Sequence, residues 1–171
     1  MVLRTKPSFT KRISRTGMFV SVALVLSFVE NAVGFFNFAP GMKLGLANIV
    51  TMIALSLGGA CFAIAVGLLR SLLASLFSGA VTMFLYSGLG TILCVVFMCL
   101  TEKMTTKISI IGRSMIGAFF FNLGQVIVAS LAVSNIHMLS YLPVLTFVST
   151  FCGIFTGYIS KKIMEAEYVK L

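Results

Sequence analysis

The longest apolar stretch of the chain runs almost without interruption from Ala60 to Leu100, and it contains a single charged residue, Arg70. One straight helix covering this stretch would be about twice as long as the roughly 30 Å hydrocarbon core of a membrane. The stretch therefore predicts two membrane-spanning helices. We place the break between them at Ser78 and Gly79.

The composition of the whole chain is that of a membrane protein. Of the 171 residues, 59% are hydrophobic and 10% are charged, whereas soluble domains carry about 25% charged residues. The length accommodates about six spans of roughly 20 residues. We expect an all-α integral membrane protein with six transmembrane helices in one bundle, over residues 17–37, 44–58, 60–77, 80–100, 109–133 and 139–160.

Basic residues flank the apolar runs and define the expected topology. Residues 1–16 form a basic N-terminal segment, residues 17–160 the transmembrane domain, and residues 161–171 a tail. Six spans place Lys43 on one side and the other flanking basic residues on the opposite side. By the positive-inside rule both termini are cytoplasmic, in a bacterial cytoplasmic membrane. Because these residues flank spans and form no continuous face, the net charge of +9 does not indicate a nucleic-acid partner.

The four cysteines predict packed thiols and no metal site. They lie inside apolar segments and lack CxxC spacing, at Cys61, Cys94, Cys99 and Cys152. Free cysteine is among the residues most often buried. We expect no cofactor.

A few polar residues interrupt the apolar segments and form the candidate site. A charge at the centre of a bilayer costs about 2.5–3.5 kcal/mol, and such residues usually face a bundle interior or a cavity. By helical rise these groups lie at mid-depth or in the outer half. The candidate substrate-binding residues are Glu30, Asn31, Lys43, Asn48, Arg70, Asn122 and Gln125.

Two interpretations of this set remain open. Glu30 and Arg70 form a structural pair that locks helices together, or they belong to an outward-facing pocket. In the pocket, Arg70 and Lys43 meet an anionic group while the carboxylate and the amides supply further hydrogen bonds. We favour the pocket, because one ion pair does not account for several amides at the same depth.

Four short motifs together resemble the Gx transporter family, which is also labelled heptaprenyl diphosphate synthase component I. The motifs are Glu30-Asn31, the stretch from Pro40 to Asn48, Leu68-Leu69-Arg70 and Asn122-Leu123-Gly124-Gln125. The resemblance covers residues 17–160, and the stretch from Pro40 to Asn48 is its most specific part. In the family a histidine often precedes the Asn-x-Gly-Gln motif, and here that position is Phe121.

The family is similar in size and topology to the S components of energy-coupling factor (ECF) transporters. This similarity implies a membrane subunit that captures a small anionic or amphipathic, vitamin-like molecule from outside. Such a subunit docks on a transmembrane T subunit driven by two ATPase subunits, and this chain has no P-loop of its own. The implied docking surface consists of small residues on the first helix, here Gly17, Ser21, Ala23 and Ser27.

The synthase label implies catalysis, which the residues do not support. Prenyl diphosphate synthases hold their substrate through Mg²⁺ bound by clustered carboxylates, and this chain contains no aspartate. We therefore expect no enzymatic activity. The alternatives are a non-catalytic membrane accessory protein of an isoprenoid, quinone-related or flavin-linked pathway, and a stand-alone carrier. Internal repeats would favour the carrier, and we find none.

Overall fold

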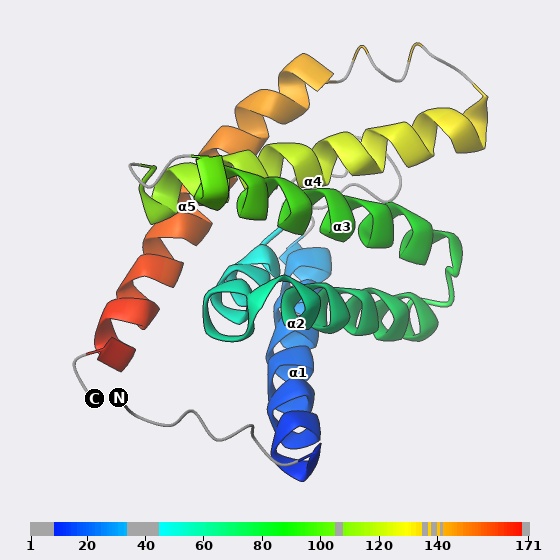
Figure 1. The fold of residues 1–171 in the computed structure, drawn as a ribbon. Coiled ribbons are helices and arrows are strands. Elements are labelled where there is room, and N and C mark those ends of the chain that lie inside the picture. The colour runs from blue at the N-terminus through cyan, green and yellow to red at the C-terminus, as the bar shows by residue number, and fades with distance from the viewer. Residues whose placement is uncertain are drawn as a thin grey trace.

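The computed structural model describes residues 9–33, 45–104, 108–134, 137, 140 and 142–168. This part of the chain contains five helices and no strand (Figure 1). They are α1 (Phe9–Val33), α2 (Asn48–Phe77), α3 (Thr82–Met104), α4 (Ile110–Val133) and α5 (Leu142–Tyr168).

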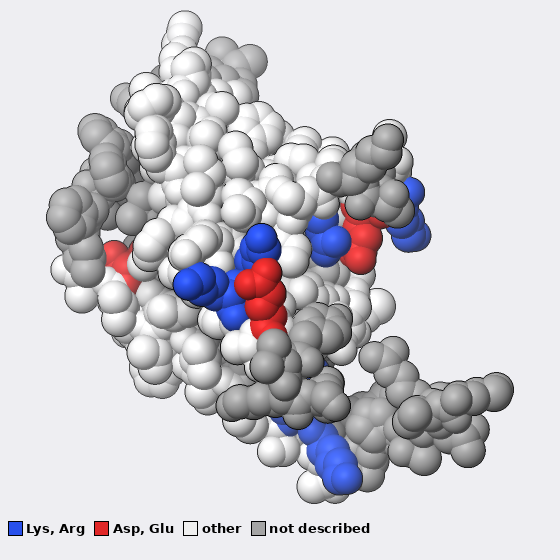
Figure 2. Space-filling view, turned by 90° about the vertical axis from the view of Figure 1, so that its left-hand side faces the viewer, with Lys and Arg blue, Asp and Glu red and all other residues white. Residues whose placement is uncertain are grey.

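All five helices are long and apolar enough to cross a membrane, which confirms the prediction of an all-α, multi-pass membrane protein. Large apolar side chains such as Met18, Phe77 and Phe147 are exposed on the outside of the bundle. On the face drawn in Figure 2, charged side chains gather in small groups separated by wide uncharged areas. Such a surface suits lipid, because soluble monomers rarely expose large apolar patches.

The sequence predicted two helices, over 44–58 and 60–77, where the structure has the single element α2. Gly59 interrupts α2 with a non-helical backbone, φ 79° and ψ −179°, in the positive-φ region that glycine adopts most readily. The predicted break therefore coincides with a distortion inside one element. The part before it covers residues 48–58, which rise only about 16 Å at 1.5 Å per residue.

The two parts of α2 extend in different directions (Figure 1). The second part begins beside the first half of α1, where the rings of Phe62 and Phe19 lie 5.5 Å apart, and ends beside its second half, where Phe77 and Phe28 lie 5.8 Å apart. The first part begins near the end of α1, because the backbone N–H just upstream of it, at Gly45, bonds to a side chain of α1. The chain thus changes direction near Gly59.

Glycines set the close approaches among the remaining helices. A Cβ at Gly124 of α4 would lie 2.7 Å from the Cα of Gly90 in α3, and a Cβ at Gly153 of α5 would lie 2.5 Å from the Cα of Met115 in α4. The latter contact places the middle of α5 beside the start of α4. Among the described helices, α1 packs only against α2.

Helix ends differ from the predicted ranges mainly by a few residues. Residues 80–100 and 109–133 were predicted where α3 and α4 are observed at Thr82–Met104 and Ile110–Val133. The larger differences are at the termini, because α1 already begins at Phe9 and α5 continues to Tyr168. Both extensions contain basic residues, and for this reason hydropathy alone does not predict that the helices continue there.

Candidate ligand-binding site

Arg70 lies at the centre of the candidate site, in the second part of α2, and is 2% exposed. Its guanidinium group contacts side chains of three helices. Nη1 donates to the hydroxyl of Ser27 in α1 at 3.4 Å, and Nη2 donates to Ser71 in α2 and Thr91 in α3, each at 3.5 Å. These contacts are longer than the usual range of roughly 2.7–3.2 Å for N–H···O hydrogen bonds and are therefore weak.

The three hydroxyls around Arg70 are oriented as acceptors. Each donates its own hydrogen to the backbone carbonyl four residues earlier in its helix, at Ala23 (3.0 Å), Gly67 (2.8 Å) and Ser87 (2.8 Å). A hydroxyl has one hydrogen and two lone pairs, so these groups offer lone pairs to the guanidinium group. Arg70 Nε has no hydrogen-bond partner in the described part of the chain.

Gly67 brings α2 and α3 together at this point. A Cβ at Gly67 would lie 2.3 Å from Cγ2 of Thr91, which is closer than two carbon atoms can pack. Glycine therefore lets the Thr91 hydroxyl reach the guanidinium group one turn further along α2.

Glu30, near the end of α1, is a buried carboxylate with 6% exposure. Its Oε1 accepts a hydrogen bond from the backbone N–H of Gly45 at 2.5 Å. Ion pairs between described residues join Glu102 to Arg113 and Lys161 to Glu165. Arg70 belongs to neither pair, and no direct ion pair between Glu30 and Arg70 is seen among the described residues.

The predicted amides lie on α2 and α4. Asn122 donates through Nδ2 to the hydroxyl of Ser149 in α5 at 2.7 Å, and Gln125 is buried one turn later on α4. Asn48 is buried at the start of α2, where the Cβ position of Gly45 lies 2.7 Å from its Nδ2 and 3.8 Å from the ring of Phe121. The start of α2 is therefore in contact with α4.

Two of these amides keep an unsatisfied polar atom. Asn48 Nδ2 and Asn122 Oδ1 have no hydrogen-bond partner among the residues that the structure describes. An unpaired buried donor or acceptor typically costs about 1–3 kcal/mol. Lys43 and the side chain of Asn31, also predicted for the site, lie outside the described residues.

The four residues predicted for partner docking lie on two faces of α1. Gly17 and Ser21 are exposed, and nothing lies within 4 Å of a Cβ placed at Gly17. Ala23 and Ser27 are each 1% exposed, and Ser27 contacts Arg70. The sequence interpretation missed this role of Ser27, although helical rise places it at the depth of Arg70.

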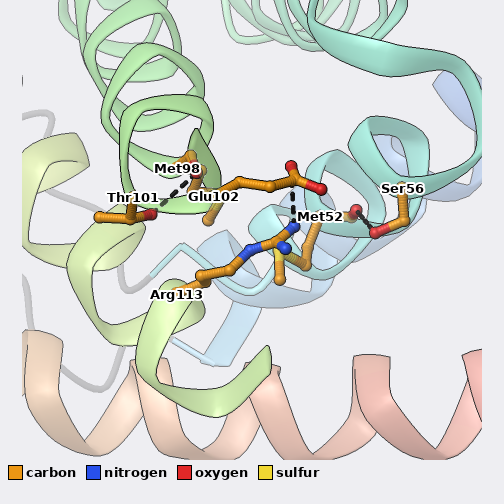
Figure 3. A network of polar contacts seen from close by, with 6 residues as sticks. All are labelled: Met52, Ser56, Met98, Thr101, Glu102 and Arg113. Atoms are coloured by element: carbon orange, nitrogen blue, oxygen red, sulfur yellow. Dashed lines mark hydrogen bonds and ion pairs between the residues drawn. The ribbon is translucent and has the colours of Figure 1, made fainter. Parts of the chain in front are cut away.

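A second polar network lies where α3 ends and α4 begins. The Arg113 and Glu102 side chains point toward each other (Figure 3), 3.3 Å apart. Nearby hydroxyls of Thr101 and Ser56 donate to backbone carbonyls of their own helices. In the described ranges no group of three or more His, Cys, Asp or Glu could hold a metal ion.

Fold and site together define a multi-pass helical membrane protein with polar groups buried between its helices. The chain belongs to the family described as heptaprenyl diphosphate synthase component I, whose model matches residues 19–163. This match confirms the family resemblance. Neither a curated protein nor a solved structure matches the chain.

Proposed function

We propose that this protein is a substrate-binding membrane subunit of the S-component type, which captures a small anionic or amphipathic molecule from outside for an ECF-type importer. The observation that supports this most strongly is the environment of Arg70. The cation is buried between three helices, and within the described part of the chain its hydrogen bonds go only to neutral hydroxyls, at 3.4–3.5 Å. Hydrogen bonds between a cation and an anion are shorter and roughly twice as strong as neutral ones, so an anionic ligand would compensate the charge far better.

The amides favour a ligand site over a purely structural role for the charge. Packing alone would be served at least as well by an apolar residue in place of a buried ion. A purely structural role would also not require Asn48 Nδ2 and Asn122 Oδ1, which lack hydrogen-bond partners among the described residues, near the contact between α2 and α4. In this proposal Arg70 and Lys43 bind the anionic group, and Glu30, Asn31, Asn48, Asn122 and Gln125 orient the remainder.

The proposed topology has six membrane segments with both termini in the cytoplasm of a bacterial cell. The change of direction at Gly59 supports dividing α2 into two segments. In this topology the chain returns to the cytoplasmic side along the predicted range 44–58, because residues 48–58 alone rise only about 16 Å. Discontinuous helices line substrate sites in many transporters. Further support comes from the basic residues at the beginning of α1 and the end of α5.

The partners in this proposal are a transmembrane T subunit and two ATPase subunits. The face of α1 with Gly17 and Ser21 is exposed, and α1 packs only against α2 among the described helices. Small residues on an exposed helix face allow another helix to approach closely. Lipid covers the remaining apolar surface.

The alternative is a non-catalytic accessory protein of an isoprenoid-related pathway, which the family description favours. Affinity purification from native membranes separates the two. The proposed function predicts that ATPase subunits co-purify in stoichiometric amounts and are lost from Gly17→Val. The control Ala132→Val, at an exposed small residue of α4, which among the described helices does not pack against α1, retains them. Co-purification of a prenyltransferase without ATPase subunits would support the accessory role instead.

A further inference from the structure

The charge available inside the bundle limits what the site can bind. Between residues 16 and 100 the sequence contains three charged residues, Glu30, Lys43 and Arg70, and between residues 114 and 160 it contains no Lys, Arg, Asp or Glu. The structure places Glu30 and Arg70 in the interior. The interior charge is therefore zero from these two residues, and +1 if Lys43 also faces the site.

A ligand with one negative charge fits this balance, and a ligand with several does not. A monoanion gives the interior a net charge of zero if Lys43 faces the site, and of −1 if it does not. A diphosphate leaves several negative charges uncompensated in either case. Each unpaired buried ion costs several kcal/mol. The remaining described cations lie toward the helix ends, namely Lys11, Arg15, Lys103, Arg113, Lys161 and Lys162.

The hydrogen-bond donors near Arg70 point to the same limit. The hydroxyls of Ser27, Ser71 and Thr91 already donate to backbone carbonyls, so they act as acceptors and would not donate to an anion. The donors at this point are the guanidinium N–H groups, a fork that matches one carboxylate or one phosphate oxygen pair.

The N-terminus of α2 is not available as a second anion site. Helix N-termini commonly bind phosphate through free backbone N–H groups. Here the N–H of Gly45 bonds to the Glu30 carboxylate, and the N–H groups of Asn48 and Ile49 bond to backbone carbonyls at 2.8 and 3.1 Å. A negatively charged group thus already occupies this end of the helix, which would repel a second anionic group.

From these observations, and on the basis of the function proposed above, we infer that the ligand carries one negative charge. Its anionic group, a carboxylate or a phosphodiester, binds at Arg70 between α1, α2 and α3. Its neutral polar part faces Asn48 and Asn122, and diphosphates are excluded. The family description would otherwise direct attention to a prenyl diphosphate.

Three probes with the same apolar chain test this inference: farnesoic acid, farnesol and farnesyl diphosphate. Binding is measured with the protein in nanodiscs of phosphatidylcholine, in EDTA and again in Mg²⁺. The carboxylate should bind at least about tenfold more tightly than the alcohol and the diphosphate, a difference of about 1.4 kcal/mol. Arg70→Met should remove the preference over the alcohol, while Arg113→Met should retain it, and circular dichroism should show that both variants are folded.

Glu30→Gln provides a second measurement, because it adds one positive charge to the interior. Affinity for the diphosphate relative to the carboxylate should rise in this variant. The inference is overturned if wild-type protein binds the diphosphate as tightly as the carboxylate, with or without Mg²⁺, or if it binds none of the probes. The proposed function is tested separately, since co-purification of ATPase subunits does not depend on ligand charge.

Discussion

The Glu30 carboxylate, near the end of α1, accepts a hydrogen bond from the backbone N–H of Gly45, three residues before α2 begins. The two residues are fifteen positions apart, so this bond fixes where the chain re-enters the bundle. It also places a negative charge at the positive end of a helix dipole.

Replacing Glu30 by glutamine should destabilise the protein. Hydrogen bonds to charged groups contribute about 1.5–3 kcal/mol, and a neutral amide oxygen retains part of that, so we expect a loss of about 1–2 kcal/mol in unfolding experiments in detergent. Glu165→Gln is the matched control, because its ion pair with Lys161 is exposed and such pairs contribute about 0–1 kcal/mol. Equal stability of the two variants would contradict the role assigned to Glu30.

Gly124→Ala should separate α3 from α4. The added Cβ would lie 2.7 Å from backbone atoms of Gly90, which a rotamer change cannot relieve, and overpacking of this kind costs about 1–3 kcal/mol. At Gly17 a Cβ meets nothing within 4 Å, so Gly17→Ala should leave the unfolding free energy of the isolated subunit unchanged or slightly higher. Comparable losses for both variants would argue against the observed helix packing.

Thr91→Val should weaken the environment of Arg70 while preserving side-chain shape. Loss of the hydroxyl acceptor leaves one more guanidinium donor unpaired, at an expected cost of about 0.5–1.5 kcal/mol. Thr146→Val is the matched control, because its exposed hydroxyl likewise bonds to the carbonyl four residues earlier, at Leu142. Among the described residues this hydroxyl makes no hydrogen bond to a charged group. If Thr146→Val destabilised the protein as much as Thr91→Val, the effect would come from the helix backbone and not from Arg70.

Cysteine labelling tests the six-segment topology. In a cysteine-free background, Lys6→Cys and Lys170→Cys should react with a membrane-impermeant maleimide only after the cells are opened. His137→Cys, at an exposed position between α4 and α5, should react in intact cells. If α2 crossed the membrane as one segment, the chain would have five spans, and the two termini would be labelled from opposite sides.

Hydropathy predicted the fold class, because apolar segments of about 20 residues have few stable alternatives in a bilayer. It predicted α3 and α4 closely for the same reason. The break at Gly59 could be predicted from the adjacent glycines Gly58 and Gly59. Its geometry could not, because hydropathy carries no information about the direction that the chain takes after the break.

The charged and amide residues of the site could be found from sequence because they are rare in apolar helices. The hydroxyl partners of Arg70 could not. Serine and threonine satisfy themselves by bonding to their own helix backbone, so Ser71 and Thr91 look the same in sequence as hydroxyls that face lipid. For Ser27 the small-residue spacing was compatible with either face of α1, and only the packing of α2 against α1 distinguishes them.

The central claim is that Arg70 binds a ligand, and native mass spectrometry of protein purified in mild detergent tests it most directly. Wild-type protein and the control variant Arg113→Met should carry a stoichiometric anionic small molecule, and folded Arg70→Met should have lost it. An empty wild-type protein, or one that holds only bulk lipid to the same extent as Arg70→Met, would contradict the claim and leave Arg70 a structural residue.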